Sequence, residues 1–203
     1  MADKSAFTLA EVLITLGIIG VVAALTMPSL IASHRAKVLE TQFKKRYSEL
    51  NQALAMLQKD NITIYGNYKT QDIAKVLVTS FKDAKLGNPR DYYNNYKNHS
   101  KGDAFNIRSL DDGLIIVNPE FFIFVNNNQP ENTIELFIDI NGEKKPNIFG
   151  YDLFEFSLQE GDNLTTIYPN NTYFCNDTNN NIGNGVSCSY FALTDKDYFK
   201  KLK

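Results

Sequence analysis

The chain is organised around the stretch Ala6-Phe7-Thr8-Leu9-Ala10-Glu11 and the run of residues 12–32 that follows it. This run of 21 residues contains no charged side chain. A helix needs about 20 mainly apolar residues to cross the hydrocarbon core of a bilayer. The run is therefore long enough to span a membrane. Glu11 lies at its edge, where a carboxylate is costly without a partner, so Glu11 is a candidate functional residue.

The quoted stretch and the short leader before it resemble the processing site of bacterial type IV prepilins and type II secretion pseudopilins. In that family a membrane peptidase cuts before the Phe and methylates the new amine, which implies a cut between Ala6 and Phe7. Glycine is usual before the cut, and Ala6 is a small residue that the family also tolerates. Pro28 falls where many such pilins carry a helix-kinking proline. A conventional secretory signal fits less well, because its apolar stretch is shorter and is cut at the far end.

The resemblance implies three parts: a leader at 1–6, a transmembrane and filament-core helix at 7–32, and a soluble pilin-like domain at 33–203. The second half of the long helix belongs to that domain. The implied partners are copies of this chain and other pilin-like subunits, the prepilin peptidase and an inner-membrane assembly platform. The implied location is a single pass through the bacterial inner membrane, and later a periplasmic or cell-surface filament.

Composition limits the other classes of function. The chain has 203 residues, 43% of them hydrophobic and 22% charged, which suits one globular domain plus an anchor. Its formal net charge is −2 and it has no long basic cluster, so binding to nucleic-acid phosphates is not indicated. The sequence also lacks the common hydrolase, phosphate-binding and zinc-protease motifs. We therefore expect a protein that is not an enzyme, with His34 and His99 as solvated or packing residues.

After the apolar run, hydrophobic residues recur at spacings of three and four, which predicts an amphipathic helix with one apolar stripe. The stripe consists of Leu39, Phe43, Tyr47, Leu50, Leu54 and Leu57. Pro28 is the only strong breaker before Asp60, and a proline inside a helix can kink it without ending it. We therefore predict one helix over about 7–59, about 80 Å long. Two separate helices are the alternative.

The second half of the chain has the pattern of strands. Short β-branched and aromatic runs with turn residues between them predict an antiparallel sheet. We expect strands at 114–117, 121–125, 133–140, 153–158 and 164–168, a helix at 71–82, a short helix or loop at 91–97, and a last strand or short helix at 189–203. The predicted fold class is α+β: a long helical spine packed on a small antiparallel sheet, as in the pilin family.

Asp139, Asn141 and Asp152 place oxygen donors around the turn residues of segment 139–152. Ca²⁺ prefers several such oxygens. The segment is similar to an Asp-x-Asn-Gly…Pro-Asn…Gly-x-Asp pattern of many pilin-like proteins, some of which bind calcium in the sheet region. Asn-Gly and Pro-Asn are also common turn pairs, so a plain turn is the alternative. No cofactor other than calcium is suggested.

Cys175 and Cys188 are the only cysteines and bracket a polar loop. A zinc site would need further Cys or His ligands nearby, so a disulfide is the better interpretation in an exported domain, with two free thiols as the alternative. The resemblance agrees, because many pilins close a carboxyl-terminal loop in this way.

Three functions compete for this sequence. The first is a structural subunit of a type IV pilus or type II secretion pseudopilus, in which Glu11 of one copy pairs with the new amine of another. The second is a single-span, membrane-anchored exported binding protein, which leaves Glu11 without a role. The third is an exported enzyme, which lacks a catalytic motif. The processing motif is shared by pilus, pseudopilus and DNA-uptake subunits, major and minor alike, and does not distinguish them.

Overall fold

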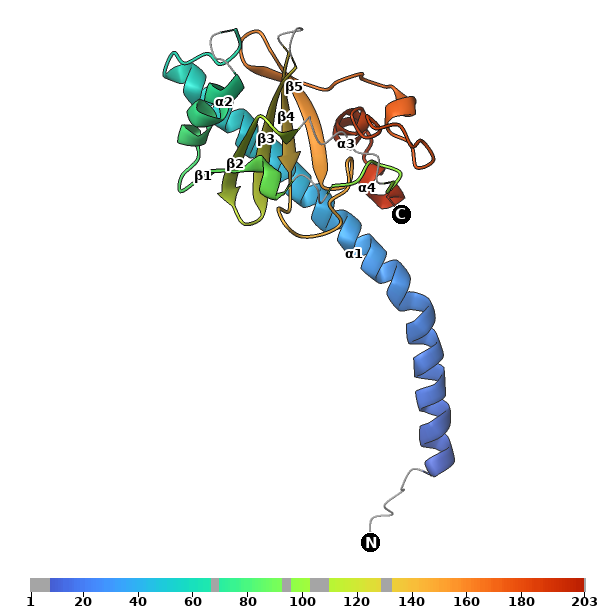
Figure 1. Cartoon of the computed structure of the whole chain (residues 1–203). Coiled ribbons are helices and arrows are strands. Elements are labelled where there is room, and N and C mark those ends of the chain that lie inside the picture. The colour runs from blue at the N-terminus through green and yellow to red at the C-terminus, as the bar shows by residue number, and fades with distance from the viewer. Residues whose placement is uncertain (1–7, 67–69, 93–95, 103–109, 129–132, 203) are drawn as a thin grey trace.

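Figure 1 shows the computed structural model of the chain. It describes residues 8–66, 70–92, 96–102, 110–128 and 133–202. A long helix leaves a globular domain built around one sheet and extends from it as a stalk. The fold is therefore α+β, with a helical spine on an antiparallel sheet, as predicted.

Helix α1, Leu9–Lys59, is 51 residues long. Thr8 caps its first turn, and Asn61 takes a left-handed backbone conformation (φ 59°) just beyond its end. Pro28 lies inside the helix and does not end it, so the prediction of one continuous helix is confirmed. α1 is also the one helix of the described residues that is long and apolar enough to cross a membrane.

The second half of α1 is buried along one face by the domain. The buried residues recur every three or four positions: Ala36, Leu39, Phe43, Arg46, Leu50, Ala53, Leu54 and Leu57. Burying each Leu or Phe of this stripe contributes about 1.5–3 kcal/mol to folding. Phe43 is the centre of the packing, with its ring centroid 4.5 Å from that of Phe154 and 5.6 Å from that of Phe199.

The sheet has six strands in sequence order, and each pairs antiparallel with the next. They are β1 (Lys85–Gly87), β2 (Gly113–Asn118), β3 (Phe121–Asn128), β4 (Thr133–Asp139), β5 (Leu153–Gln159) and β6 (Asn163–Thr165). Alternate side chains face opposite sides of a strand. Phe154, Phe156 and Leu158 pack with α1, whereas Leu153 packs on the other face with Phe137.

Short helices complete the domain: α2 (Thr70–Leu77), α3 (Cys188–Thr194) and α4 (Tyr198–Lys201), with 3₁₀ turns at Val78–Ser80, Pro89–Asp91 and Thr172–Phe174. The helix predicted at 71–82 thus ends earlier and continues as a 3₁₀ turn. The strand predicted at 164–168 is shorter than expected, and the end of the chain forms helices. The edge strand Lys85–Gly87 was not predicted, because three residues are too few to show an alternation.

Candidate functional site

The amino end of α1 is closed by a capping box between Thr8 and Glu11. The backbone N–H and the hydroxyl of Thr8 both donate to Oε2 of Glu11, each at 2.8 Å. In return, the backbone N–H of Glu11 donates to the Thr8 hydroxyl at 3.3 Å. The pattern Thr-x-x-Glu of a capping box is present in the sequence, so Glu11 has a local structural role besides its charge. Ala6 and Phe7 lie outside the described residues.

The capping box leaves part of the Glu11 carboxylate open. Both bonds from Thr8 converge on Oε2, and no hydrogen bond joins Oε1 to any described residue. A carboxylate offers about four acceptor positions. Glu11 can therefore keep its capping role and accept a further donor from another molecule.

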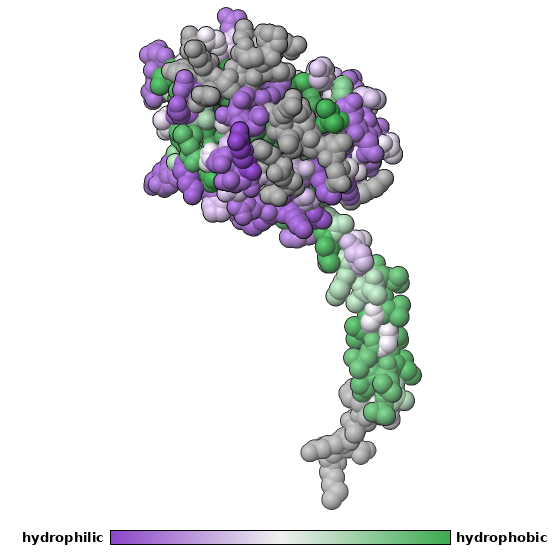
Figure 2. Space-filling model, in the orientation of Figure 1, coloured by the Kyte–Doolittle hydropathy of each residue, from purple (hydrophilic) through white to green (hydrophobic). Residues whose placement is uncertain are grey.

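The first half of α1 is apolar and exposed on every side. Leu9, Ile18 and Leu30 are 79%, 60% and 70% exposed, and the most apolar part of the helix has no buried residue. Figure 2 shows this part as a nearly continuous hydrophobic surface below a largely hydrophilic domain. Apolar patches on this scale mark membrane or protein interaction sites.

A second polar centre lies in the turn between β4 and β5, where Asp139 and Asp152 are both fully buried. Oδ1 of Asp139 accepts the backbone N–H groups of Asn141 (3.0 Å) and Gly142 (2.7 Å), and its Oδ2 accepts the hydroxyl of Tyr96. These bonds hold the start of the turn closed, which fits the plain-turn alternative as well as the calcium site.

Asp152 closes the other end of the same turn. Its Oδ1 accepts the backbone N–H of Ile148 at 2.7 Å, and its Oδ2 accepts the backbone N–H of Asn147 at 2.7 Å. The side-chain amide of Asn141 also donates to Oδ2, at 3.2 Å. The structure thus brings all three predicted calcium ligands together.

Part of this centre has more acceptors than donors. Asn141 Oδ1 and Asn147 Oδ1 are buried without a hydrogen-bond partner among the described residues. Burial, followed by the charge of Asp152, raises the pKa of Asp139 well above its usual range. Burial also raises the pKa of Asp152, to about 6. Two buried carboxyls and two unpartnered amide oxygens fit the oxygen-rich environment that Ca²⁺ prefers.

The turn is joined to the carboxyl-terminal loop through Gly150, which has φ 82°. A Cβ on Gly150 would lie 2.6 Å from both Cys188 Sγ and His99 Nδ1. Glycine is therefore required here for its backbone conformation and for the close approach of the loop.

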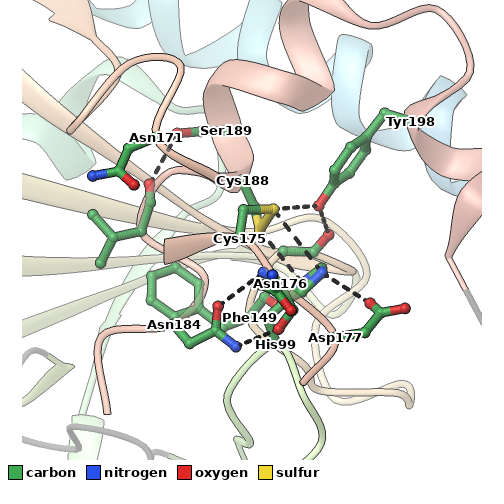
Figure 3. The surroundings of a disulfide bond; sticks show 12 residues. His99, Phe149, Asn171, Cys175, Asn176, Asp177, Asn184, Cys188, Ser189 and Tyr198 are labelled. Carbon is green, nitrogen blue, oxygen red and sulfur yellow. Dashed lines mark hydrogen bonds and ion pairs between the residues drawn. A yellow bond between two sulfur atoms is a disulfide. The ribbon is translucent and has the colours of Figure 1, made fainter. Parts of the chain in front are cut away.

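The predicted disulfide between Cys175 and Cys188 is present and lies against His99 (Figure 3). His99 Nδ1 is 3.3 Å from Cys188 Sγ, and Nε2 is 4.0 Å from Cys175 Sγ. Sequence analysis expected His99 to be a solvated or packing residue in a polar loop. The ring is buried and packed, but its contacts with the disulfide come from a residue 76 positions before Cys175, a separation that no local pattern reveals.

The contacts of His99 define its tautomer. Nδ1 lies 3.1 Å from the carbonyl oxygen of Phe149, which can only accept, so Nδ1 carries the proton. Burial lowers the pKa of His99, although the Phe149 carbonyl and Asp177 act in the opposite direction. In the neutral ring Nε2 has a lone pair, and it lies 3.5 Å from Oδ1 of Asp177.

Comparison with known proteins gives one match. Residues 1–27 match the family described as the prokaryotic N-terminal methylation motif. This motif is the signature of type IV pilin and pseudopilin precursors, so the chain carries that signature at the same place as its exposed apolar helix. No curated protein and no solved structure matches the chain.

The raised pKa of Asp152 predicts a pH dependence of stability. The folded state binds the proton more tightly than the unfolded state, whose Asp pKa is 3.8. This contribution is therefore fully present below about pH 3.8 and is lost as the pH rises through about 6. The loss is on the order of 3 kcal/mol, since the pKa rises from 3.8 to about 6 and one pKa unit corresponds to about 1.36 kcal/mol.

The test compares the full chain with Asp152→Asn by chemical denaturation in detergent and a calcium chelator. Asp152→Asn weakens the turn at every pH, but the wild-type advantage over it should shrink between pH 4 and pH 7. Asp60→Asn, at an exposed position, is the matched control. Its free energy of unfolding should depend on pH in the same way as that of the wild type. A stability difference between wild type and Asp152→Asn that does not change with pH would contradict the raised pKa of Asp152.

Proposed function

We propose that this chain is the precursor of a structural subunit of a type IV pilus or type II secretion pseudopilus. It is cut between Ala6 and Phe7 and polymerises through the first half of α1. The observation that carries this proposal is the all-round exposure of that half, which continues as one helix into a domain that buries only the second half. An exposed apolar helix of this length needs either lipid or other helices around it.

The proposal uses both surroundings in turn. Before assembly, residues 7–32 cross the bacterial inner membrane once, and the domain at 33–203 lies outside the cytoplasm. On assembly the same surface leaves the lipid and packs among other copies or other pilin-like subunits. The prepilin peptidase removes residues 1–6, and an inner-membrane assembly platform inserts the subunit.

Glu11 sets the position of the incoming subunit in this proposal. Cutting before Phe7 creates a positive amine close to the amino end of α1. Oε1 of Glu11 is the acceptor that the capping box leaves open, so Glu11 of one copy accepts the Phe7 amine of another. Between packed helices, away from water, such a pair offsets the burial of both charges and fixes one axial register.

A single-span, membrane-anchored binding protein is the alternative. It explains the apolar surface equally well, because lipid alone would cover it. It gives no role to the cut or to the open oxygen of Glu11. The processing motif is shared by pilus, pseudopilus and DNA-uptake subunits, so the choice among these filaments needs observations on cells.

We also propose that the turn at 139–152 holds Ca²⁺ through Asp139, Asn141 and Asp152. Support comes from the two buried carboxyls and from the unpartnered Oδ1 atoms of Asn141 and Asn147. A cation there would remove the repulsion between the carboxyls and supply the missing partner of the amide oxygens.

Processing is tested on protein purified from its native host. We expect the mature chain to begin at Phe7, with a methylated amine, as measured by mass spectrometry of the terminal peptide. Ala6→Leu should accumulate uncut precursor, because the peptidase must accept a small side chain there, whereas Ala10→Leu is the control with the same change beyond the cut. A mature chain that begins at Met1, or well inside the apolar run, would rule out the assignment.

The charge of Glu11 is tested with Glu11→Gln, because Gln at the third helical position can still form a capping box. Membrane insertion should persist, since the change removes a charge from the edge of the span. Filament yield should fall by about tenfold or more, because the incoming subunit loses its attraction for the amine. The measurement is the ratio of sheared filaments to membrane pool in a host without the wild-type copy.

Thr8→Ala is the matched control for this experiment, since it breaks the cap and keeps the charge. It should lose about 1 kcal/mol of helix capping but still assemble. Processing of both variants is checked by terminal mass spectrometry. Equal filament yield from equal pools of wild type and Glu11→Gln would contradict the pairing.

Calcium binding is tested by thermal unfolding of the full chain in detergent. Calcium at a hundredfold excess over its dissociation constant should add about 2.7 kcal/mol to the stability, which appears as a higher melting temperature. Asp139→Asn should abolish this increment and Asp60→Asn should keep it. If millimolar calcium leaves the wild-type melting temperature unchanged, the segment is a plain turn.

A further inference from the structure

Apart from the turn at 139–152, the described residues contain a second group of side chains that could hold a metal ion, and it surrounds the disulfide. His99, Cys175 and Cys188 each offer one ligand atom, and these atoms lie within 4.8 Å of one another. The two cysteines alone offer two sulfurs, which are too few for a zinc site. The fold adds the imidazole from a loop 76 residues before Cys175.

The orientation of His99 is that of a metal ligand. A histidine that binds a metal through one nitrogen usually donates its other ring N–H to a carbonyl or carboxylate, which fixes the ring. His99 does this, because Nδ1 donates to the carbonyl oxygen of Phe149 at 3.1 Å. Nε2 is therefore the nitrogen that keeps a lone pair, and it lies 4.0 Å from the sulfur of Cys175. The sulfur of Cys188 lies 3.3 Å from Nδ1.

A carboxylate lies beside this nitrogen. Asp177 Oδ1 is 3.5 Å from Nε2, and Figure 3 draws this contact as a dashed line. Both atoms are acceptors when the ring is neutral, and this distance leaves room for both to bind one cation. His99, Cys175 and Asp177 also line a cavity of about 390 Å³, which gives an ion a way in.

We propose that the reduced chain binds one Zn²⁺ through Cys175, Cys188, Nε2 of His99 and the carboxylate of Asp177. Two sulfurs, one nitrogen and one oxygen are all ligands that Zn²⁺ accepts, and four of them complete its tetrahedral shell. The zinc site and the disulfide are alternative closures of the same loop. The proposal does not depend on filament assembly.

The required movement is small. Two Zn–S bonds of about 2.3 Å at a tetrahedral angle place the sulfurs about 3.8 Å apart. The Cα atoms of Cys175 and Cys188 are 5.1 Å apart, so rotation of the two side chains can reach this separation without moving the backbone. Cys188 is fully buried and Cys175 is half-buried, so the cavity side of the cluster is where zinc enters.

The zinc-bound loop can be converted to the disulfide-bonded loop by oxidation of the two cysteines. Each cysteine loses one proton when Zn²⁺ binds, and the two sulfurs are then thiolates. An external disulfide oxidant converts this form to the Cys175–Cys188 disulfide. Zn²⁺ leaves, two electrons pass from the thiolates to the oxidant, and the oxidant takes up two protons to become two thiols. A chain exported before oxidation thus has a closed loop from the start.

The test uses the full chain in detergent, reduced with a phosphine. Zinc affinity is measured by competition with a chromogenic chelator, and Co²⁺ serves as the spectroscopic probe for thiolate ligands. We expect one Zn²⁺ per reduced chain, a higher melting temperature with zinc, and a thiolate-to-cobalt charge-transfer band. The oxidised chain should show none of the three.

Four variants locate the ligands. His99→Gln should lower zinc affinity by about 10- to 100-fold, in line with the loss of a metal-site residue. His34→Gln is the matched control, because His34 is the only other histidine and is exposed on α1. Asp177→Asn changes a partly exposed side chain and should weaken binding without unfolding the domain. Cys175→Ser combined with Cys188→Ser should abolish the cobalt band.

Two results would overturn the proposal. One is a reduced wild-type chain that binds no stoichiometric zinc. The other is equal zinc affinity in wild type, His99→Gln and Asp177→Asn, which would mean that the two thiols bind the metal without the folded site. Far-ultraviolet circular dichroism of each reduced variant shows whether its domain is folded. If His99→Gln is unfolded, the zinc affinity of Asp177→Asn decides whether the folded site binds the metal.

Discussion

The fold rests on one feature, that α1 is a single continuous helix with two different surfaces. Its second half has one apolar stripe, and the sheet buries that stripe around Phe43. Its first half is apolar on every side and receives no cover from the domain. The folded chain therefore buries the apolar surface of only the second half of α1. The other half requires a surrounding that the chain itself does not provide, and lipid and neighbouring helices are the two that fit.

The domain is held together at a second place by polar contacts. Gly150 lets the β4–β5 turn approach the Cys175–Cys188 disulfide, and the ring of His99 fills the space between them. Tyr198 adds a bond from its hydroxyl to the Gly150 carbonyl at 2.5 Å, which ties α4 to the same point. The turn, the disulfide loop and the last helix are thus one connected unit packed beside α1.

Much of this fold could be predicted because its signals are local. The stripe from Leu39 to Leu57, the alternation in β4 and the two cysteines each show within a short window. The features that the sequence does not predict depend on contacts between residues far apart in the chain. His99 meets the disulfide from 76 residues away, and Tyr96 meets Asp139 from 43 residues away, so neither role has a local pattern. The Thr8–Glu11 capping box is a different case, because its Thr-x-x-Glu spacing is a local pattern that the sequence alone shows.

In the proposed assembly, the first half of α1 passes from lipid to other copies of the chain. A photo-crosslinking residue at Ile18, which is 60% exposed, reports on this transfer in living cells. We expect cross-links to lipid in the membrane fraction and cross-links between copies of this chain, or to other pilin-like subunits, in sheared surface material. Cross-links to lipid alone in every fraction would contradict it.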